Sequence, residues 1–538
     1  MIGGPSKSSD RQSNRLLARQ SSPHSQKHIP FGLWTWALLL ILIIVPRLWN
    51  FTNTIQFGQD QGIDMIVVWH MEHTGHHPLI GPFLSLPNFY TPPTYYYLTW
   101  AFYHAMDGSV NGVVYGYFVL NVLSILALIA LTKSIGGKHT AIWMAFLLAI
   151  SITMINHGRN IWQPFPIQFF LSLWLLGVWH AHIKKNTLLM YGATVCFVIA
   201  LSIYPSPAIL VPTVIYQLMQ WQMTVKNHSP RTAFFVSVGI FAAMCLVVFI
   251  PQLIFEITHH FPSLRSAFTS FYPTTVHQPL LTLLQNVYAL LCSFVPIQMM
   301  TPIPQVFFGT IIVLLLILFA WKAGSYSPFS KLYSPVALGL GCLILMLPLD
   351  IHPHRTWALL PFLFLFSAIG IDSIWKTMHL RALIWLFIGI YTTFNIYASL
   401  PLWTKSPYNS IRTTKTSSLF IQKDVTARQL SKDDFGIFYK IPNDPDNGNY
   451  GVFRYIYWLL NNDLYQAPLT NEGNMPQFNY AVPDLKPYMY IVCDNFMSSE
   501  NAYTHCVRPI IENRPYRTLR EVWIDETIIF ILTNESPE

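Results

Sequence analysis

The stretch Phe31–Trp49 reads FGLWTWALLLILIIVPRLW and carries one charged residue, Arg47. Roughly 20 mostly apolar residues are needed for a helix to cross the hydrocarbon core of a bilayer, so the stretch predicts a membrane-spanning helix. Working outward, similar apolar runs recur as far as about Trp403. About eleven spans are expected, at residues 31–49, 112–132, 140–156, 163–182, 188–204, 207–222, 232–252, 304–321, 333–349, 356–373 and 382–400.

The composition agrees with this interpretation. Of the 538 residues, 52% are apolar and 10% are charged, whereas about 25% of the residues of soluble domains are charged. We therefore expect an α-helical polytopic membrane protein, and the composition excludes an ordinary soluble one. A lipid bilayer is therefore one of its expected partners.

The Lys and Arg residues predict the orientation, because short cytoplasmic loops collect positive charge. With a cytoplasmic N-terminus, the inner segments hold fifteen of them. The outer side of the membrane region holds four, namely Arg47, Arg159, Arg265 and Arg355. The net charge of +8 thus follows from topology, and no nucleic-acid partner is expected. The expected location is the plasma (inner) membrane, with the C-terminus extracytoplasmic.

Three regions are expected along the chain. Residues 1–30 form a basic cytoplasmic tail before an uncleaved signal anchor. Residues 31–403 form the transmembrane domain, with two long outer loops at 50–111 and 253–303. Residues 404–538 hold 13 of the 32 basic and 16 of the 24 acidic residues, which is typical of a small extracytoplasmic α/β domain. The oxidising exterior permits a disulfide between Cys493 and Cys506 in this region.

Acidic residues are concentrated on the outer side. Before residue 405 the chain has eight acids, and six of them are expected to face outward: Asp60, Asp64, Glu72, Asp107, Glu256 and Asp350. Positive charge sets topology, so topology alone does not require this bias. Asp60 and Asp64 are four residues apart and would share one face of a helix. Such a pair could activate a hydroxyl or an amine, hold a cation, or be no more than a solvated helix end.

The sequence around this pair resembles a known superfamily. FGQDQGID (57–64), LIGP (79–82) and YTPPTYYYL (90–98) are similar to the first outer loop of the GT-C glycosyltransferases. This superfamily includes the aminoarabinose transferases of lipid A and the protein O-mannosyltransferases. The resemblance implies an inverting enzyme with a polyprenyl-phosphate sugar donor and a lipid, glycan or protein acceptor. It implies that Asp60 is the catalytic base, with Asp64 as its neighbour or as a cation ligand.

The donor phosphate needs cations, and guanidinium groups match phosphate oxygens. Arg159 and Arg355 lie at outer helix ends and are the expected phosphate ligands, although both could instead be interface anchors. Tyr95 is a candidate for stacking on the sugar ring, or else part of an aromatic belt. The outer α/β region is expected to help select the acceptor.

A divalent metal ion is the one candidate cofactor. Glu256, His259 and His260 in the second long loop have suitable ligand chemistry. However, relatives of the aminoarabinose-transferase type carry Glu-Lys where this chain has Tyr90-Thr91, so their metal site does not transfer directly.

Two other functions remain open. A transporter or flippase of lipid-linked saccharides would have as many crossings, but charged residues near mid-membrane would be expected of it. A polymerase or ligase of lipid-linked saccharides would share both the lipid carrier and the outer site. The concentration of acids at one face favours an enzyme.

Overall fold

The computed structural model describes residues 32–82, 84, 89–270, 292–296, 311–312, 314–319, 321–323, 357–377, 380–404, 409–440, 452–460, 486–495, 498–512 and 514–534. The chain divides into two compact units, Met1–Ile41 and Leu42–Glu538. The second unit contains all the functional residues discussed below. Arg355 lies outside the described residues.

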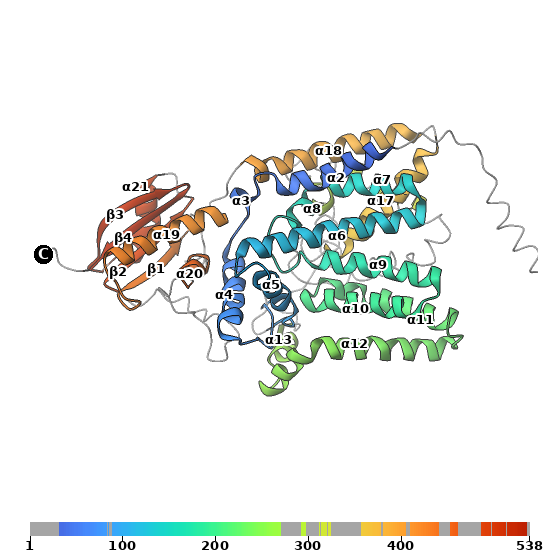
Figure 1. Ribbon diagram of the computed structural model, residues 1–538, viewed down its shortest axis with the longest axis horizontal. Helices are drawn as coiled ribbons and strands as arrows, with labels where there is room; N and C mark the ends of the chain where they lie inside the picture. The colour runs from blue at the N-terminus through green and yellow to red at the C-terminus, as the bar shows by residue number, and fades with distance from the viewer. Residues whose placement is uncertain are drawn as a thin grey trace, which may run out of the picture. The chain divides into compact units, whose positions relative to one another are not determined.

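Helices form nearly all of the described chain up to residue 404 (Figure 1). They are α2 (Leu33–Leu48), α3 (Phe51–Thr54), α4 (Gln59–Thr74), α5 (Thr94–His104), α6 (Val110–Gly136), α7 (Lys138–Ile150), α8 (Ile152–His157), α9 (Ile167–Lys184), α10 (Thr187–Ile203), η1 (Ser206–Leu210), α11 (Val211–Thr224), α12 (Pro230–Thr258), α13 (Pro262–Ser270), α17 (Leu360–Trp375) and α18 (Arg381–Thr404). Helices α6, α9, α10 and α12 lie side by side, each against the next.

Four helices in the described residues are long and apolar enough to cross a membrane, at Val110–Gly136, Pro230–Thr258, Trp357–Trp375 and Arg381–Thr404. Shorter apolar helices accompany them. Nine of the predicted spans coincide with described helices, although the span at 140–156 is broken at Ser151 into α7 and α8. The span at 333–349 and half of 304–321 lie outside the described residues. The count of eleven therefore stays a prediction.

A four-stranded mixed sheet follows the helices (Figure 1). Its strands are β1 (Phe435–Lys440), β2 (Tyr488–Asp494), β3 (Arg517–Ile524) and β4 (Thr527–Thr533), in the order β1-β2-β4-β3. The β1–β2 pair is parallel, and the other two pairs are antiparallel. The short β-rich runs at 435–439, 488–492 and 528–532 predict three of these four strands, β1, β2 and β4.

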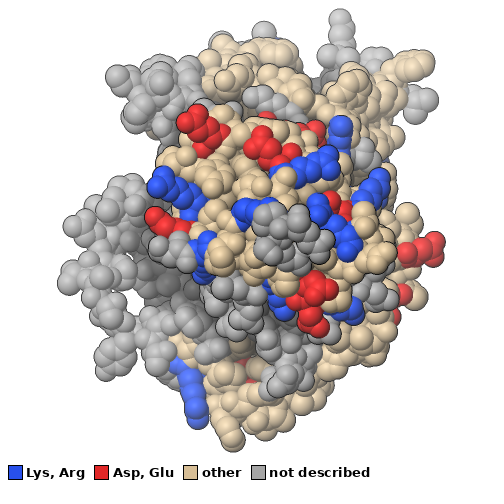
Figure 2. All heavy atoms as spheres, turned by 90° about the vertical axis from the view of Figure 1, so that its left-hand side faces the viewer, with Lys and Arg blue, Asp and Glu red and all other residues tan. Residues whose placement is uncertain are grey.

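The sheet lies between helices. All seven residues of β4 are buried, as expected of an apolar run that is covered on both faces. The helices of this region are α19 (Ile411–Ala427), α20 (Phe453–Leu460), α21 (Ser499–Ala502), η6 (Tyr503–Val507) and α22 (Arg508–Ile511). Seen from the side that carries the sheet, Lys and Arg residues are interspersed with Asp and Glu (Figure 2).

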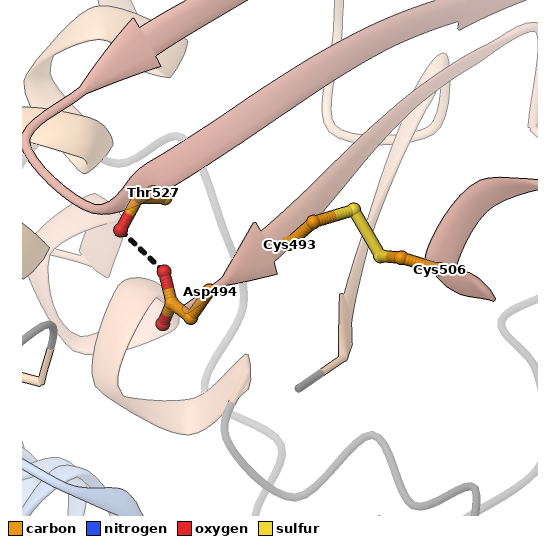
Figure 3. The surroundings of a disulfide bond; sticks show 4 residues. All are labelled: Cys493, Asp494, Cys506 and Thr527. Atoms are coloured by element: carbon orange, nitrogen blue, oxygen red, sulfur yellow. Dashed lines mark hydrogen bonds between the residues drawn. A yellow bond between two sulfur atoms is a disulfide. The ribbon is translucent and has the colours of Figure 1, made fainter. Parts of the chain in front are cut away.

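Cys493 and Cys506 are joined in a disulfide (Figure 3). It links the end of β2 to η6, within a buried cluster that includes Ile491, Val507 and Phe530. The sequence analysis predicts this disulfide only from the oxidising compartment expected for both cysteines.

Candidate active site

Helix α4 carries the two aspartates of the segment predicted to be the first outer loop. It begins after Gly58, whose N–H donates to Gln61 Oε1 at 2.9 Å, so the side chain of Gln61 satisfies a donor at the helix start. It ends at Gly75, which has a left-handed φ of 68°, a conformation that favours glycine. Asp60 lies in the first turn, where the helix dipole favours a negative charge.

Asp64 is the buried member of the pair. Its side chain is 4% exposed and accepts a hydrogen bond from Tyr95 Oη at 2.9 Å, while the Tyr96 hydroxyl bonds the same carboxyl group. Burial, and then the nearby charge of Asp60, raise the pKa of Asp64 well above its usual range. Burial also raises the pKa of both tyrosines, so they remain donors.

Asp60 differs from Asp64 because solvent reaches its side chain. Even so, desolvation by the surrounding protein raises its pKa, and a hydrogen bond from Trp162 opposes the rise. That bond runs from Trp162 Nε1 to Asp60 Oδ2 over 3.2 Å. A carboxylate that is both accessible and partly desolvated is a better proton acceptor than a fully solvated one.

The segment between α8 and α9, which holds residues 160–162, is tied to the start of α4. Asn160 Oδ1 accepts from the Gln56 N–H at 2.9 Å, and Gln61 Nε2 donates to the Ile161 carbonyl at 2.8 Å. Trp162, next in the chain, reaches Asp60. Sequence reasoning missed Gln61 and Trp162, because their partners lie 100 and 102 residues away and no periodicity relates such positions.

The sequence predicts that Arg159 binds the donor phosphate. In the structure, its guanidinium group is bonded to other residues of the chain. Its side chain is 1% exposed. One terminal nitrogen donates to the carbonyl oxygens of residues 46, 47 and 49, and the other donates to Thr54 Oγ1 and the Leu402 carbonyl. These carbonyls lie at the C-terminal ends of α2 and α18, which favour a cation. A phosphate would have to displace these acceptors.

Tyr95 also departs from its expected role. Its side chain is 0% exposed, and its hydroxyl is bonded to Asp64, so the ring presents no open face to a sugar. The structure makes it a support for the buried carboxylate. Arg355, the other expected phosphate ligand, lies outside the described residues.

The expected metal ligands do not converge. Glu256 Oε2 accepts from the Ser263 N–H at 3.2 Å. His259 stacks on Phe255, with ring centroids 4.1 Å apart, and its Nδ1 lies 2.9 Å from the carbonyl of the same Phe255. Among the described residues, which include Glu256, His259 and His260, no group of three or more His, Cys, Asp or Glu side chains could hold a metal ion.

Comparison of whole structures identifies the class of fold. The chain is similar to the crystal structure of ArnT from Cupriavidus metallidurans in the apo state, with a TM-score of 0.52, 10% sequence identity, and coverage of 94% of this chain and 98% of that one. The structure of the same transferase bound to undecaprenyl phosphate gives a TM-score of 0.50, 11% identity, and coverage of 94% and 99%. The fold expected from the sequence resemblance to the aminoarabinose transferases is thereby confirmed. No protein-family model and no curated protein sequence matches the chain.

Proposed function

We propose that the chain is an integral-membrane glycosyltransferase, which moves a sugar from a polyprenyl-phosphate donor to an acceptor at the outer face. The observation that carries this proposal is the carboxylate of Asp60, accessible yet partly desolvated, at the start of the first outer loop of a GT-C fold. Support for the donor class comes from ArnT, which has the same fold and has been crystallised with undecaprenyl phosphate.

Asp60 acts as the general base. It takes the proton of an acceptor hydroxyl or amine as the acceptor atom attacks the anomeric carbon. The bond between that carbon and the phosphate oxygen breaks, and polyprenyl phosphate leaves with the bonding electrons. A single displacement inverts the anomeric centre. Burial raises the pKa of Asp64 well above its usual range, which favours its protonated form and so limits repulsion beside Asp60.

The phosphate is assigned to Arg355, an outer cation whose guanidinium suits phosphate oxygens. Arg159 is assigned a structural role, because its terminal nitrogens already donate to five acceptors. Burial lowers the pKa of Arg159 to about 10, so it is still protonated at neutral pH.

The proposed topology has about eleven crossings of the inner membrane, a cytoplasmic N-terminus and an extracytoplasmic C-terminus. The boundaries proposed for the transmembrane and C-terminal domains are 31–403 and 404–538. The C-terminal domain would help to select a lipid, glycan or protein acceptor.

The test is sugar transfer by the purified full-length protein from a panel of polyprenyl-phosphate sugars, with the products characterised by NMR. The proposal expects release of polyprenyl phosphate with at least one donor, and an inverted anomeric configuration in the product. Retention of configuration would contradict the single displacement. Movement of intact donor across vesicle membranes with no transfer would support a flippase instead.

A further inference from the structure

Helix α20, in the C-terminal part of the chain, packs directly on α4. The contact is closest at Gly62, where an added Cβ would lie 2.5 Å from the backbone N of Arg454 and 2.7 Å from its Cα. Side-chain carbons do not approach backbone atoms this closely, so only glycine allows this contact. Gly62 lies midway between Asp60 and Asp64. The C-terminal region therefore meets α4 within one turn of both carboxylates.

Further contacts hold the two segments together just before α4. The ring of Phe57 lies 5.7 Å from that of Tyr457 and 5.9 Å from that of Trp458. Just before α4, the N–H of Phe57 donates to the Asn409 carbonyl at 2.6 Å. This strand-like pairing and the aromatic contacts both fix the segment that leads into the helix.

Helix α20 is in turn anchored to the sheet. Arg454 and Asp494 form a buried ion pair, and Asp494 also accepts from Tyr455 Oη at 3.1 Å. Figure 3 shows the remaining oxygen of Asp494 bonded to Thr527, and Asp494 itself directly following the disulfide-bonded Cys493. Arg454, whose backbone contacts Gly62, is thus fixed by its side chain to the end of β2.

The interior of α4 shows how tightly it is enclosed. Gly62–Val68, in the first half of the helix, are all buried. Helix α5 contacts α4, and so does α20. A helix enclosed in this way does not adjust its tilt without moving one of its neighbours.

We propose that α20 is a positioning element of the active site, which sets the place of Asp60 through the backbone contact between Gly62 and Arg454. This proposal rests on the proposed function, since it assigns a role in the reaction to the base at Asp60. Gly62 and Arg454 are positioning residues, because neither is assigned a contact with the reacting atoms. The C-terminal region then contributes to the rate of the chemical step as well as to acceptor choice.

The test compares Gly62→Ala with Gly192→Ala. Gly192 also lies inside a helix, α10, but an added Cβ there meets nothing within 4 Å. For Gly62→Ala we expect kcat per folded molecule to fall by about a hundredfold, the effect of a base displaced by about 1 Å, with little change in the donor KM. Water admitted beside Asp60 relieves its desolvation, so the acid limb of the pH profile should move to lower pH. Gly192→Ala should match the wild type in each respect.

Hydrogen–deuterium exchange gives a readout that needs no activity. Peptides covering α4 and α20 should exchange faster in Gly62→Ala than in the wild type or Gly192→Ala. Unchanged exchange in α4 would overturn the positioning role, even if no donor is found. Absence of transfer by the wild type, with faster exchange in Gly62→Ala, would instead contradict the proposed function alone.

A milder variant covers the case in which Gly62→Ala does not fold. Phe57→Leu removes the ring contacts with Tyr457 and Trp458 and leaves the backbone contact intact. It should give the same faster exchange and the same direction of pH shift, with a smaller loss of kcat. A wild-type pH profile and wild-type exchange in Phe57→Leu would contradict the proposal.

Discussion

The start of α4 and the loop that carries Arg159 look alike in the sequence, because each has isolated charge at the predicted outer face of an apolar protein. The structure separates them. Within the described part of the chain, Asp60 is open to solvent and accepts one side-chain hydrogen bond, from Trp162. Arg159 is buried there and donates to five acceptors. A charged group whose hydrogen bonds are all made within the protein stabilises the fold. An accessible charged group remains available for chemistry.

Arg47 supports the same distinction. It is fully buried and donates to the carbonyls of Leu148 and Ala149, in the last turn of α7, and to Asn121 Oδ1 at 2.8 Å. Two of the four outer arginines therefore cap helix C-termini, where carbonyls lack intrahelical partners. Variants of the buried arginines should therefore affect stability, and variants at or beside Asp60 should affect catalysis.

The largest effect on stability is expected for Arg159→Met. The substitution leaves several carbonyl groups at the ends of α2 and α18 without a donor, and each unsatisfied buried group costs about 1–3 kcal/mol. We expect a marked fall in the thermal unfolding temperature of the detergent-solubilised protein. Arg412→Met, at an exposed position of α19, is the matched control. If Arg159→Met has wild-type stability and a raised donor KM, the structural role is wrong and Arg159 binds the donor phosphate.

An intermediate effect, on pH dependence, is expected for Trp162→Phe. The hydrogen bond from Trp162 lowers the pKa of Asp60, so its loss raises that pKa further. Because the base must be ionised, activity should be lost at a higher pH as the solution is acidified, and kcat should approach the wild-type value at alkaline pH. The measurement is the pH profile of kcat/KM, with Trp385→Phe as a control. A profile that falls uniformly at every pH would show that Trp162 does not tune Asp60.

The smallest effect is expected for Asp64→Asn. The amide oxygen of asparagine can still accept from Tyr95, so the rate should fall by less than the ~10²-fold that marks the lower end for a general base. Burial raises the pKa of Asp64 in the folded state, so wild-type stability declines as pH rises through that pKa. The asparagine variant lacks this titration and should gain stability over the wild type toward alkaline pH. A loss as large as that of Asp60→Asn would mean that the two aspartates share the role of base.

Sequence reasoning predicted most of the helices, because long apolar runs such as those of α6, α12 and α18 have few other stable arrangements. It missed β3, since that strand lies at the sheet edge, is mostly exposed, and has the polar sequence RTLREVWI. It selected Asp60 and Asp64 through their spacing and a family resemblance. It could not assign the roles of Arg159 and Tyr95, which depend on partners that are distant in the sequence.

The most direct test of the account is sugar transfer by Asp60→Asn, compared with Asp107→Asn as a control. Asp107 is an exposed acid with a φ of 52°, a conformation that asparagine also tolerates. If Asp60 is the base, Asp60→Asn should lower kcat by about 10²–10⁴-fold at unchanged thermal stability, and Asp107→Asn should keep the wild-type rate. A fully active Asp60→Asn enzyme would contradict the assignment of the catalytic base.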